Sequence, residues 1–402
     1  MKSDRIIYLL IFLVLIWYHC FGYVGVAAYS NIFNGLCYII TPILILSAFR
    51  EISFKKHGVP TLILYSTIIS MFTTMVLWGQ DLTDTIKGFR TYYLVLVFFF
   101  LFSKKADTGK VEKALVVIAL IYVLCWLYQV VSVPTLVFGM DRDDNLGSMD
   151  ARGFYRFWIP TKENMPILVL FFYELYRRTK KRIYIALVPI CFLIVILHVG
   201  RQMMFWSFLS LVLFILYSNR RKWRMIVLSA VAVYMLFVVM VDNIPTLNLL
   251  FEQTQTQVDS GSDDIRAQAI SFYWHESLKN PIGFLFGNGI GYGGGALSNF
   301  TAKATMNGFY ESDIGYFALL FDFGILGVLS YVLLLWQVLK MKVDDRYVYL
   351  KCYLIYVYGS YTLAHCLTTN IFFNMCVIYI LYMSNKVVIR NATSQTNFIC
   401  KK

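Results

Sequence analysis

Charged residues are scarce in this chain of 402 residues: they make up 15% of it, against about 25% in soluble domains. Hydrophobic residues make up 59%, and a soluble fold of this size has no interior large enough to bury so many. The composition therefore excludes an ordinary soluble protein. It predicts an all-α polytopic membrane protein.

The sequence also lacks the patterns of metal and redox sites. Its eight cysteines form no C-x-x-C pair, and all but Cys400 lie in or beside apolar stretches, where lone thiols behave as small hydrophobic side chains. The five histidines are scattered, and none belongs to an H-E-x-x-H motif or a carboxylate cluster. We therefore expect no metal ion and no other cofactor.

The net charge of +13 does not indicate nucleic acid, because of where the charges lie. Most of the 36 basic residues occur in short clusters between apolar runs, which is how membrane proteins encode their orientation. The partner expected from this pattern is the lipid bilayer. With the N-terminus inside, both termini and the intervening basic clusters are predicted to be cytoplasmic: 2–5, 50–57, 103–113, 177–182, 219–224, 340–346 and 386–402.

About twelve apolar segments approach the roughly 20 residues that a membrane-spanning helix needs. The N-terminal residues 1–5 lead into a long apolar run with no A-x-A-like cleavage site, which predicts an uncleaved signal-anchor. The segments are 6–23, 32–49, 59–78, 88–103, 114–133, 159–176, 183–199, 203–218, 225–241, 313–339, 347–365 and 367–385.

The predicted spans divide the chain into three parts. Residues 1–241 hold helices 1–9 and a short outer loop at 134–158, residues 242–312 form a large outer loop, and residues 313–402 hold the last three helices and a cytoplasmic tail. Ordered loops of that length are usually functional. The loop spacing from 265 to 278 predicts an amphipathic helix with Ile265, Ala269, Phe272 and Leu278 on one face.

Five arginines at the outer face are candidates for binding a diphosphate, because a guanidinium group binds phosphate oxygens in bidentate fashion. Arg90 begins the fourth span, Arg201 lies in the short turn after the seventh, and Arg152, Arg156 and Arg266 lie in the two outer loops. The alternative for each is an arginine that reaches the membrane surface or pairs with a loop aspartate.

Two carboxylates, Glu311 and Asp313, open the tenth span and are candidate catalytic bases. Their alternative role is to cap that helix. His275, on the loop helix beside Glu276, is a further catalytic candidate. His198, near the outer end of a span, is expected to be hydrogen-bonded within the bundle.

The stretch Gly289-x-Gly291-x-x-Gly294 matches the spacing of a dinucleotide fingerprint. That fingerprint requires a preceding strand and a following helix in a βαβ unit. In an outer loop between spans the stretch instead predicts a tight, flexible turn that returns the loop to the membrane.

Three regions together resemble the Wzy-type polysaccharide polymerases and the related O-antigen ligases. Members of the ligase group and many polymerases carry a His-Asn pair before the tenth span, whereas this chain has Glu311-Ser-Asp313, a departure that favours a polymerase. The three regions are Ala151-Arg-Gly-Phe154 with Ile159-Pro-Thr-Lys-Glu-Asn-Met-Pro166; His198-Val-Gly-Arg-Gln-Met-Met204; and Asn280-Pro-Ile-Gly283 through Phe286-Gly-Asn-Gly-Ile-Gly291 and Ser312-Asp-Ile-Gly-Tyr316 to Gly324-Ile-Leu-Gly327.

The resemblance implies a GT-C-like, metal-independent glycosyltransferase of the bacterial cytoplasmic membrane. Its donor would be the glycan growing on undecaprenyl diphosphate, and its acceptor a repeat unit on the same lipid, for O-antigen, capsule or related polysaccharides. A flippase and a chain-length regulator are implied partners. In such a reaction the arginines would stabilise the leaving diphosphate, and Glu311 or Asp313 would act on the acceptor hydroxyl.

Other functions remain open at this stage. A flippase or transporter of lipid-linked oligosaccharide fits twelve spans with intramembrane charges, although the sequence shows no six-span repeat and its long loop is placed asymmetrically. An O-antigen ligase and a membrane protein without enzymatic activity are the remaining alternatives.

Overall fold

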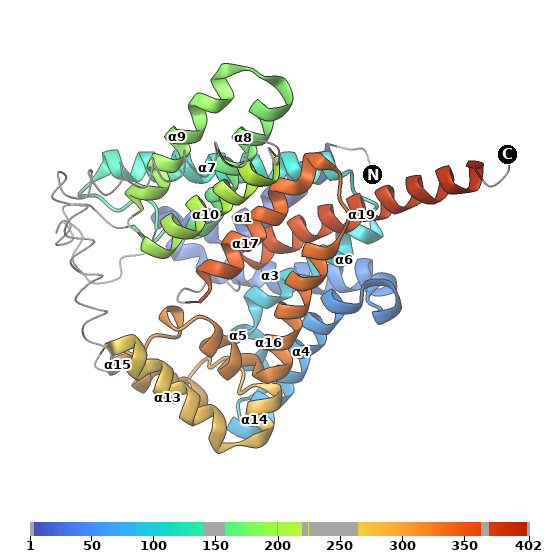
Figure 1. The fold of residues 1–402 in the computed structure, drawn as a ribbon. Helices are drawn as coiled ribbons and strands as arrows, with labels where there is room; N and C mark the ends of the chain where they lie inside the picture. The colour runs from blue at the N-terminus through green and yellow to red at the C-terminus, as the bar shows by residue number, and fades with distance from the viewer. Residues whose placement is uncertain are drawn as a thin grey trace.

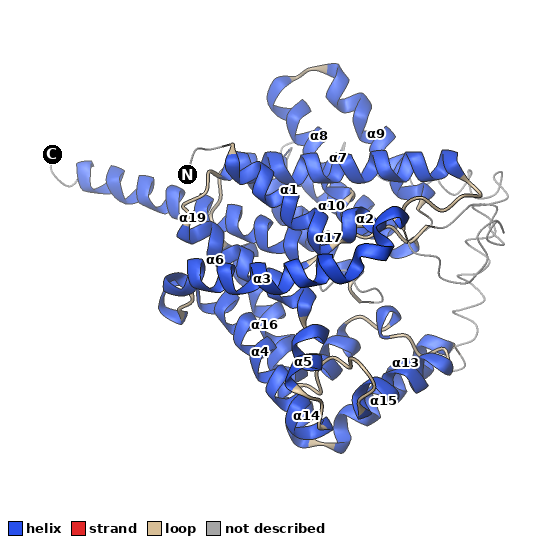
Figure 2. Cartoon of the chain, turned by 180° about the vertical axis from the view of Figure 1, so that it is seen from behind, coloured by secondary structure: helices blue, strands red, loops and turns tan. Residues whose placement is uncertain are grey.

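The structure of the chain is a computed structural model that describes residues 4–139, 157–198, 200–218, 224, 264–362 and 370–399. Within these ranges the regular structure is helical, and β-type contacts are isolated bridges, such as the one between Tyr23 and Phe138. The prediction of an all-α fold is confirmed for this part of the chain (Figure 2).

The helices before the large outer loop are α1 (Arg5–Trp17), α2 (His19–Gly22), η1 (Val24–Tyr29), α3 (Ser30–Ala48), η2 (Phe49–Glu51), α4 (Phe54–Trp78), α5 (Leu82–Gly88), η3 (Arg90–Val95), α6 (Leu96–Ser103), α7 (Thr108–Ser132), η4 (Lys162–Asn164), α8 (Pro166–Thr179), α9 (Arg182–Leu197) and α10 (Arg201–Ser218). Those that follow are α13 (Ile265–Lys279), α14 (Pro281–Phe286), α15 (Ala296–Met306), η7 (Glu311–Asp313), α16 (Tyr316–Lys340), η8 (Asp345–Tyr347), α17 (Val348–Ser360) and α19 (Ile371–Ile399).

Six described helices are long and apolar enough to cross a membrane, which identifies the chain as a polytopic membrane protein. A seventh span is present if α5 and the η3–α6 helix, which meet at a 59° bend, count as one. The apolar helices α1 and α9 are shorter, and the predicted span at 225–241 lies outside the described residues. The count of twelve therefore stays a prediction. The six helices are Val24–Glu51, Phe54–Trp78, Thr108–Ser132, Arg201–Ser218, Tyr316–Lys340 and Ile371–Asn391.

Several of the segments predicted to be cytoplasmic meet around the α6–α7 turn. Lys110 forms an ion pair of 2.6 Å with Asp4 near the N-terminus. Lys386 of α19 lies 4.6 Å from the ring centre of Phe102 in α6. Basic segments that are far apart in sequence thus share one end of the bundle, as the positive-inside pattern requires. Which side of the membrane that end faces stays a prediction.

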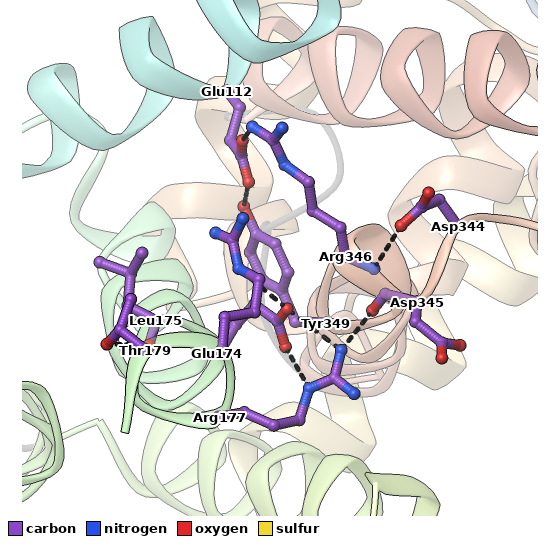
Figure 3. Close-up of polar contacts among 10 residues, drawn as sticks. Glu112, Glu174, Leu175, Arg177, Thr179, Asp344, Asp345, Arg346 and Tyr349 are labelled. Atoms are coloured by element: carbon purple, nitrogen blue, oxygen red, sulfur yellow. Dashed lines mark hydrogen bonds and ion pairs between the residues drawn. The ribbon is translucent and has the colours of Figure 1, made fainter. Parts of the chain in front are cut away.

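A polar network joins three of these segments at the same end (Figure 3). Glu112 of α7 accepts hydrogen bonds from Arg346 and from the Tyr349 hydroxyl, the latter at 2.9 Å. Glu174 of α8 accepts from the Arg177 Nε at 2.7 Å, and Arg177 also donates to the Asp345 carbonyl at 2.8 Å (Figure 3). We refer to these side chains, Glu112, Glu174, Arg177, Arg346 and Tyr349, as the paired network.

The helices α13, α14 and α15 lie apart from α7, α8, α9 and α10 in both views of the ribbon (Figures 1 and 2). They pack against the ends of α4 and α16 around a second apolar core. In that core the ring of Phe300 stacks on Phe272 at 5.4 Å and on Phe321 at 5.6 Å. The helices α13, α14 and α15 are therefore anchored on two of the membrane-spanning helices.

The helix predicted at 265–278 is confirmed as α13, and its buried face differs from the predicted apolar face. Its buried positions are Ala269, Tyr273 and Ser277, spaced four residues apart. Ile265 and Leu278 remain exposed. The reason is that α13 turns the face centred on Tyr273 toward Phe321 of α16, with their rings 5.1 Å apart.

Candidate functional site

The α16 helix is broken inside its apolar run, at Gly324. This glycine has φ 66° and ψ −173°, a backbone conformation that side chains with a Cβ rarely adopt. A Cβ there would also lie 2.5 Å from the backbone of Leu285 in α14. Gly324 therefore permits both the break in α16 and the close approach of α14.

The break frees carbonyl groups that the glycine-rich segment binds. The Asn288 amide donates to the Phe321 carbonyl at 2.7 Å, and the Gly289 amide donates to the Asp322 carbonyl at 3.0 Å. Ser70 of α4 donates its hydroxyl to the same Asp322 carbonyl. Backbone groups that leave a helix at membrane depth must find such partners, because no water is available there.

The neighbouring helix α4 holds the segment from its other side. Thr73 donates its hydroxyl to the Gly287 carbonyl at 2.7 Å. Gly289 has φ 83°, and a Cβ at this position would lie 1.5 Å from the hydroxyl oxygen of Thr74. Residues 287–289 thus form an ordered segment between α4 and α16, and the flexible turn predicted from Gly289 to Gly294 stays a prediction.

Asp322 lies beside this segment and is only 1% exposed. Neither of its carboxylate oxygens has a hydrogen-bond partner among the described residues. Glu311 and the Tyr92 side chain are both close enough to interact with it electrostatically. A buried carboxylate without a partner is unfavourable for stability, which makes this a candidate functional group.

Glu311 in η7 is the second member of the site, and we call the two residues the acidic pair. Its side chain is partly buried, and the Tyr273 hydroxyl of α13 forms a hydrogen bond with it. Loss of water on burial raises the pKa of Glu311 to about 7, against the opposite effect of the Tyr273 hydrogen bond. Glu311 therefore exchanges a proton near neutral pH, as a general base requires.

The other two candidate catalytic residues lie outside the acidic pair. Asp313 accepts a hydrogen bond of 3.3 Å from the neighbouring Ser312 hydroxyl. His275 is exposed, and its Nδ1 donates to the Ser271 carbonyl of its own helix at 2.7 Å. Their catalytic roles stay predictions. His198, as expected, is hydrogen-bonded in the bundle, at 2.6 Å from the Tyr122 hydroxyl.

Among the candidate arginines, Arg90 has a second basic side chain, Lys87, in its surroundings. It begins η3, at the bend that follows α5, and its carbonyl accepts a hydrogen bond from the Trp17 indole at 3.1 Å. Its side chain forms no ion pair within the part of the chain that the structure describes. Lys87 shares its neighbour Tyr38 and stands 5.8 Å from the ring centre of Tyr292.

The remaining candidate arginines do not form one cluster with Arg90 in the described structure. Arg201 begins α10, which packs on α8, α9 and α17, whereas Arg266 begins α13, which packs on α14 and α16. Both views separate α10 from α13 (Figures 1 and 2). Arg152 and Arg156 lie outside the described residues.

No metal centre is visible within the described ranges. In them, no group of three or more histidine, cysteine, aspartate or glutamate side chains is arranged to hold a metal ion. The acidic pair has two carboxylates and a tyrosine hydroxyl nearby, which suits proton transfer.

The sequence interpretation missed Asp322 and Tyr273. Asp322 carried a usable signal, because an acidic residue within an apolar run is expensive in a membrane and usually functional. That argument was applied to the arginines only. Tyr273 carried no such signal, since its role depends on which face of α13 meets α16.

Comparisons of the chain with protein families, with curated proteins and with solved structures find no match. The fold and the site together define a polytopic helical membrane protein with a buried acidic pair at a helix break. Any narrower assignment is a proposal.

Proposed function

We propose that the chain is a glycosyltransferase that polymerises undecaprenyl-diphosphate-linked repeat units at the outer face of the bacterial cytoplasmic membrane. The observation that carries the proposal is the acidic pair: Glu311, with a pKa of about 7, next to the unpartnered carboxylate of Asp322. The motif resemblance supports it, because the pair lies at the start of the span where that resemblance places the polar motif.

In the proposed reaction, Glu311 accepts the proton of the acceptor hydroxyl as its oxygen attacks the anomeric carbon of the donor. The bond from that carbon to the diphosphate breaks, and the diphosphate leaves with the electron pair. Asp322 is close enough to interact with Glu311 electrostatically, so this second carboxyl group influences how readily Glu311 accepts the proton.

The leaving diphosphate needs positive charge, and Arg90 and Lys87 offer it. Arg90 forms no ion pair among the described side chains, while Lys87 is bound to Asp84 at 3.2 Å. Residue 290 lies beside both the α5–η3 bend and the ordered segment: its carbonyl accepts from Gln80 at 3.1 Å. The glycine-rich segment thus runs from the acidic pair toward the cationic side chains. Further candidates for this role are Arg201, Arg266, Arg152 and Arg156.

The wider setting is part of the same proposal. We infer about twelve spans in a GT-C-like arrangement, cytoplasmic termini, and the growing chain and single repeat unit as donor and acceptor. A flippase that supplies the repeat units and a chain-length regulator are the expected partners.

The direct test is polymerisation by the purified protein in lipid nanodiscs supplied with lipid-linked repeat units. We expect long products from the unchanged protein, also in excess EDTA, and only single units from Glu311→Gln. Glu276→Gln is the matched control, because Glu276 pairs with Lys279 on the same outer unit, away from the acidic pair. Long products from Glu311→Gln, or none from the unchanged protein, would contradict the proposal.

A flippase or transporter is the second candidate, and a specific observation favours it. Two adjoining helical elements are interrupted, α16 at Gly324 and the α5/η3–α6 pair at its 59° bend. Interrupted helices beside a charged residue are typical of transporter binding sites. Deletion of the protein separates the two functions: a lost polymerase leaves single units displayed outside, whereas a lost flippase leaves lipid-linked units facing the cytoplasm.

A further inference from the structure

The ordered segment at 287–289 lies below the outer ends of the two helices that hold it. Its partner Asp322 is six residues into α16, about 9 Å along the helix, and Thr74 is four residues before the end of α4, about 6 Å. The 25 residues of α16 correspond to about 37 Å of helical rise, divided by the break at Gly324, against the roughly 30 Å of a bilayer core. These depths put the segment at the outer edge of the hydrocarbon region.

The helix α14 that precedes the segment is apolar throughout its six residues, 281–286. Asn280 caps it by accepting hydrogen bonds from the amides of Ile282 and Gly283. Its inner side touches Gly324, whereas Ile282 is 50% exposed and Leu285 47%. A helix so apolar and so exposed is unexpected in water.

The helices that pack against α14 also carry exposed apolar side chains. On α4, Val76 is 78% exposed, three residues after Thr73, which binds Gly287. On α13, Trp274 and Leu278 are exposed four residues apart, hence on one face, and Trp274 packs edge-on against Phe284 of α14. The next face of α13 carries His275 and Lys279, both exposed and polar.

We propose that α14 and the end of α13 form a re-entrant element whose exposed apolar face contacts the acyl chains of the outer leaflet. The exposed apolar side chains on α4, which packs against α14, and the depth of the 287–289 segment both point to lipid. Trp274 then sits at the interface that tryptophan prefers, and Lys279 reaches the lipid phosphates. The irregular backbone that follows is tolerated because it is enclosed by α4 and α16.

The test uses spin labels on single cysteines in a variant without the eight native cysteines, reconstituted in vesicles of neutral and anionic phospholipid. Labels at Leu278, Ile282 and Leu285 are expected to be relaxed more by oxygen than by a water-soluble nickel chelate, the signature of lipid. The control label at His275 is expected to show the reverse. Access of the nickel chelate to Ile282 and Leu285 equal to that at His275 would overturn the proposal, as would low access of both reagents, which indicates cover by protein.

A second experiment needs no substitution. The unchanged chain is reconstituted with a lipid that carries a photoreactive group on its acyl chain, irradiated and digested. Adducts are expected on the peptide containing 278–286 as well as on the exposed side of α4. Adducts on α4 with none on 278–286 would overturn the proposal.

Discussion

Two groups of buried charge differ in how their charges are balanced. In the paired network, Glu112 meets Arg346 and Tyr349, and Glu174 meets Arg177. These contacts tie together α7, α8 and the turn between α16 and α17, three segments that are distant in sequence (Figure 3). Each buried carboxylate in it thus has a cation, as is usual for charges that serve the fold.

In the acidic pair, by contrast, Asp322 has no hydrogen-bond partner in the described structure, and it interacts electrostatically with another carboxylate, Glu311. Like charges in a buried place oppose folding, so the fold gives no reason for the pair. The comparison teaches that burial alone does not mark a functional carboxylate. A functional carboxylate is marked by burial without a hydrogen-bond partner or a cation.

The largest expected effect comes from neutralising the pair. Asp322→Asn and Glu311→Gln should each reduce polymer formation by at least about 100-fold, the size of a general acid–base contribution. Asp322→Asn should leave the melting temperature unchanged or higher, because it removes a buried carboxyl group that has no hydrogen-bond partner among the described residues. Polymer assays and thermal unfolding of the purified variants measure the two effects. A lower melting temperature for Asp322→Asn would show that the carboxylate has a structural partner.

The next largest effect is expected from a substitution that strains the backbone of the ordered segment at 287–289. Gly289→Ala strains a positive φ, about 1–3 kcal/mol, and drives a methyl group against Thr74, so the melting temperature and the activity should both fall. Gly294→Ala is the matched control, since no atom lies within 4 Å of a Cβ added there. Equal melting temperatures for the two variants would contradict the docking of this segment.

Breaking the paired network should lower the stability and leave the activity unchanged, which is the opposite of the result expected for Asp322→Asn. Glu112→Gln should lower the free energy of unfolding by about 1–3 kcal/mol, because Arg346 and Tyr349 lose a charged acceptor, and the protein that remains folded should keep its activity. Replacing both partners, with Glu112→Gln and Arg346→Gln, should restore part of the loss. Denaturation in detergent measures this, and an additive double variant would show that the two side chains do not interact.

The smallest effect concerns pH. An unfolded glutamate has a pKa of about 4.3, whereas burial raises the pKa of Glu311 to about 7. Between these values the folded chain holds a proton that the unfolded chain has released, so the stability from Glu311 is present below about pH 4.3 and is lost as the pH rises to about 7. The melting temperature of the unchanged protein should fall across this range more than that of Glu311→Gln. Parallel curves for the two would contradict the raised pKa.

The apolar runs predicted the helices well, because length and hydropathy are local properties. The α13 helix and the apolar runs of α4, α7 and α16 are found where the sequence predicts them. The break at Gly324 was not predicted, because its partners on α4 lie about 250 residues earlier in the chain, as the Ser70 to Asp322 bond shows. Glu311 was selected for its place at a helix start, but its raised pKa depends on its burial, which follows from tertiary packing.

The hydroxyl groups of α4 have a consequence for how the protein is made. Thr73 enters the membrane long before the ribosome has produced Gly287, whose carbonyl it binds. Thr73 and the neighbouring Thr74 have an acceptor in their own helix, since both donate to the Ser70 carbonyl, at 2.9 and 2.7 Å. An α4 helix that enters the lipid alone can therefore satisfy the hydroxyls of these two threonines internally. Thr73 then shares its bond with Gly287 when the later half of the chain arrives.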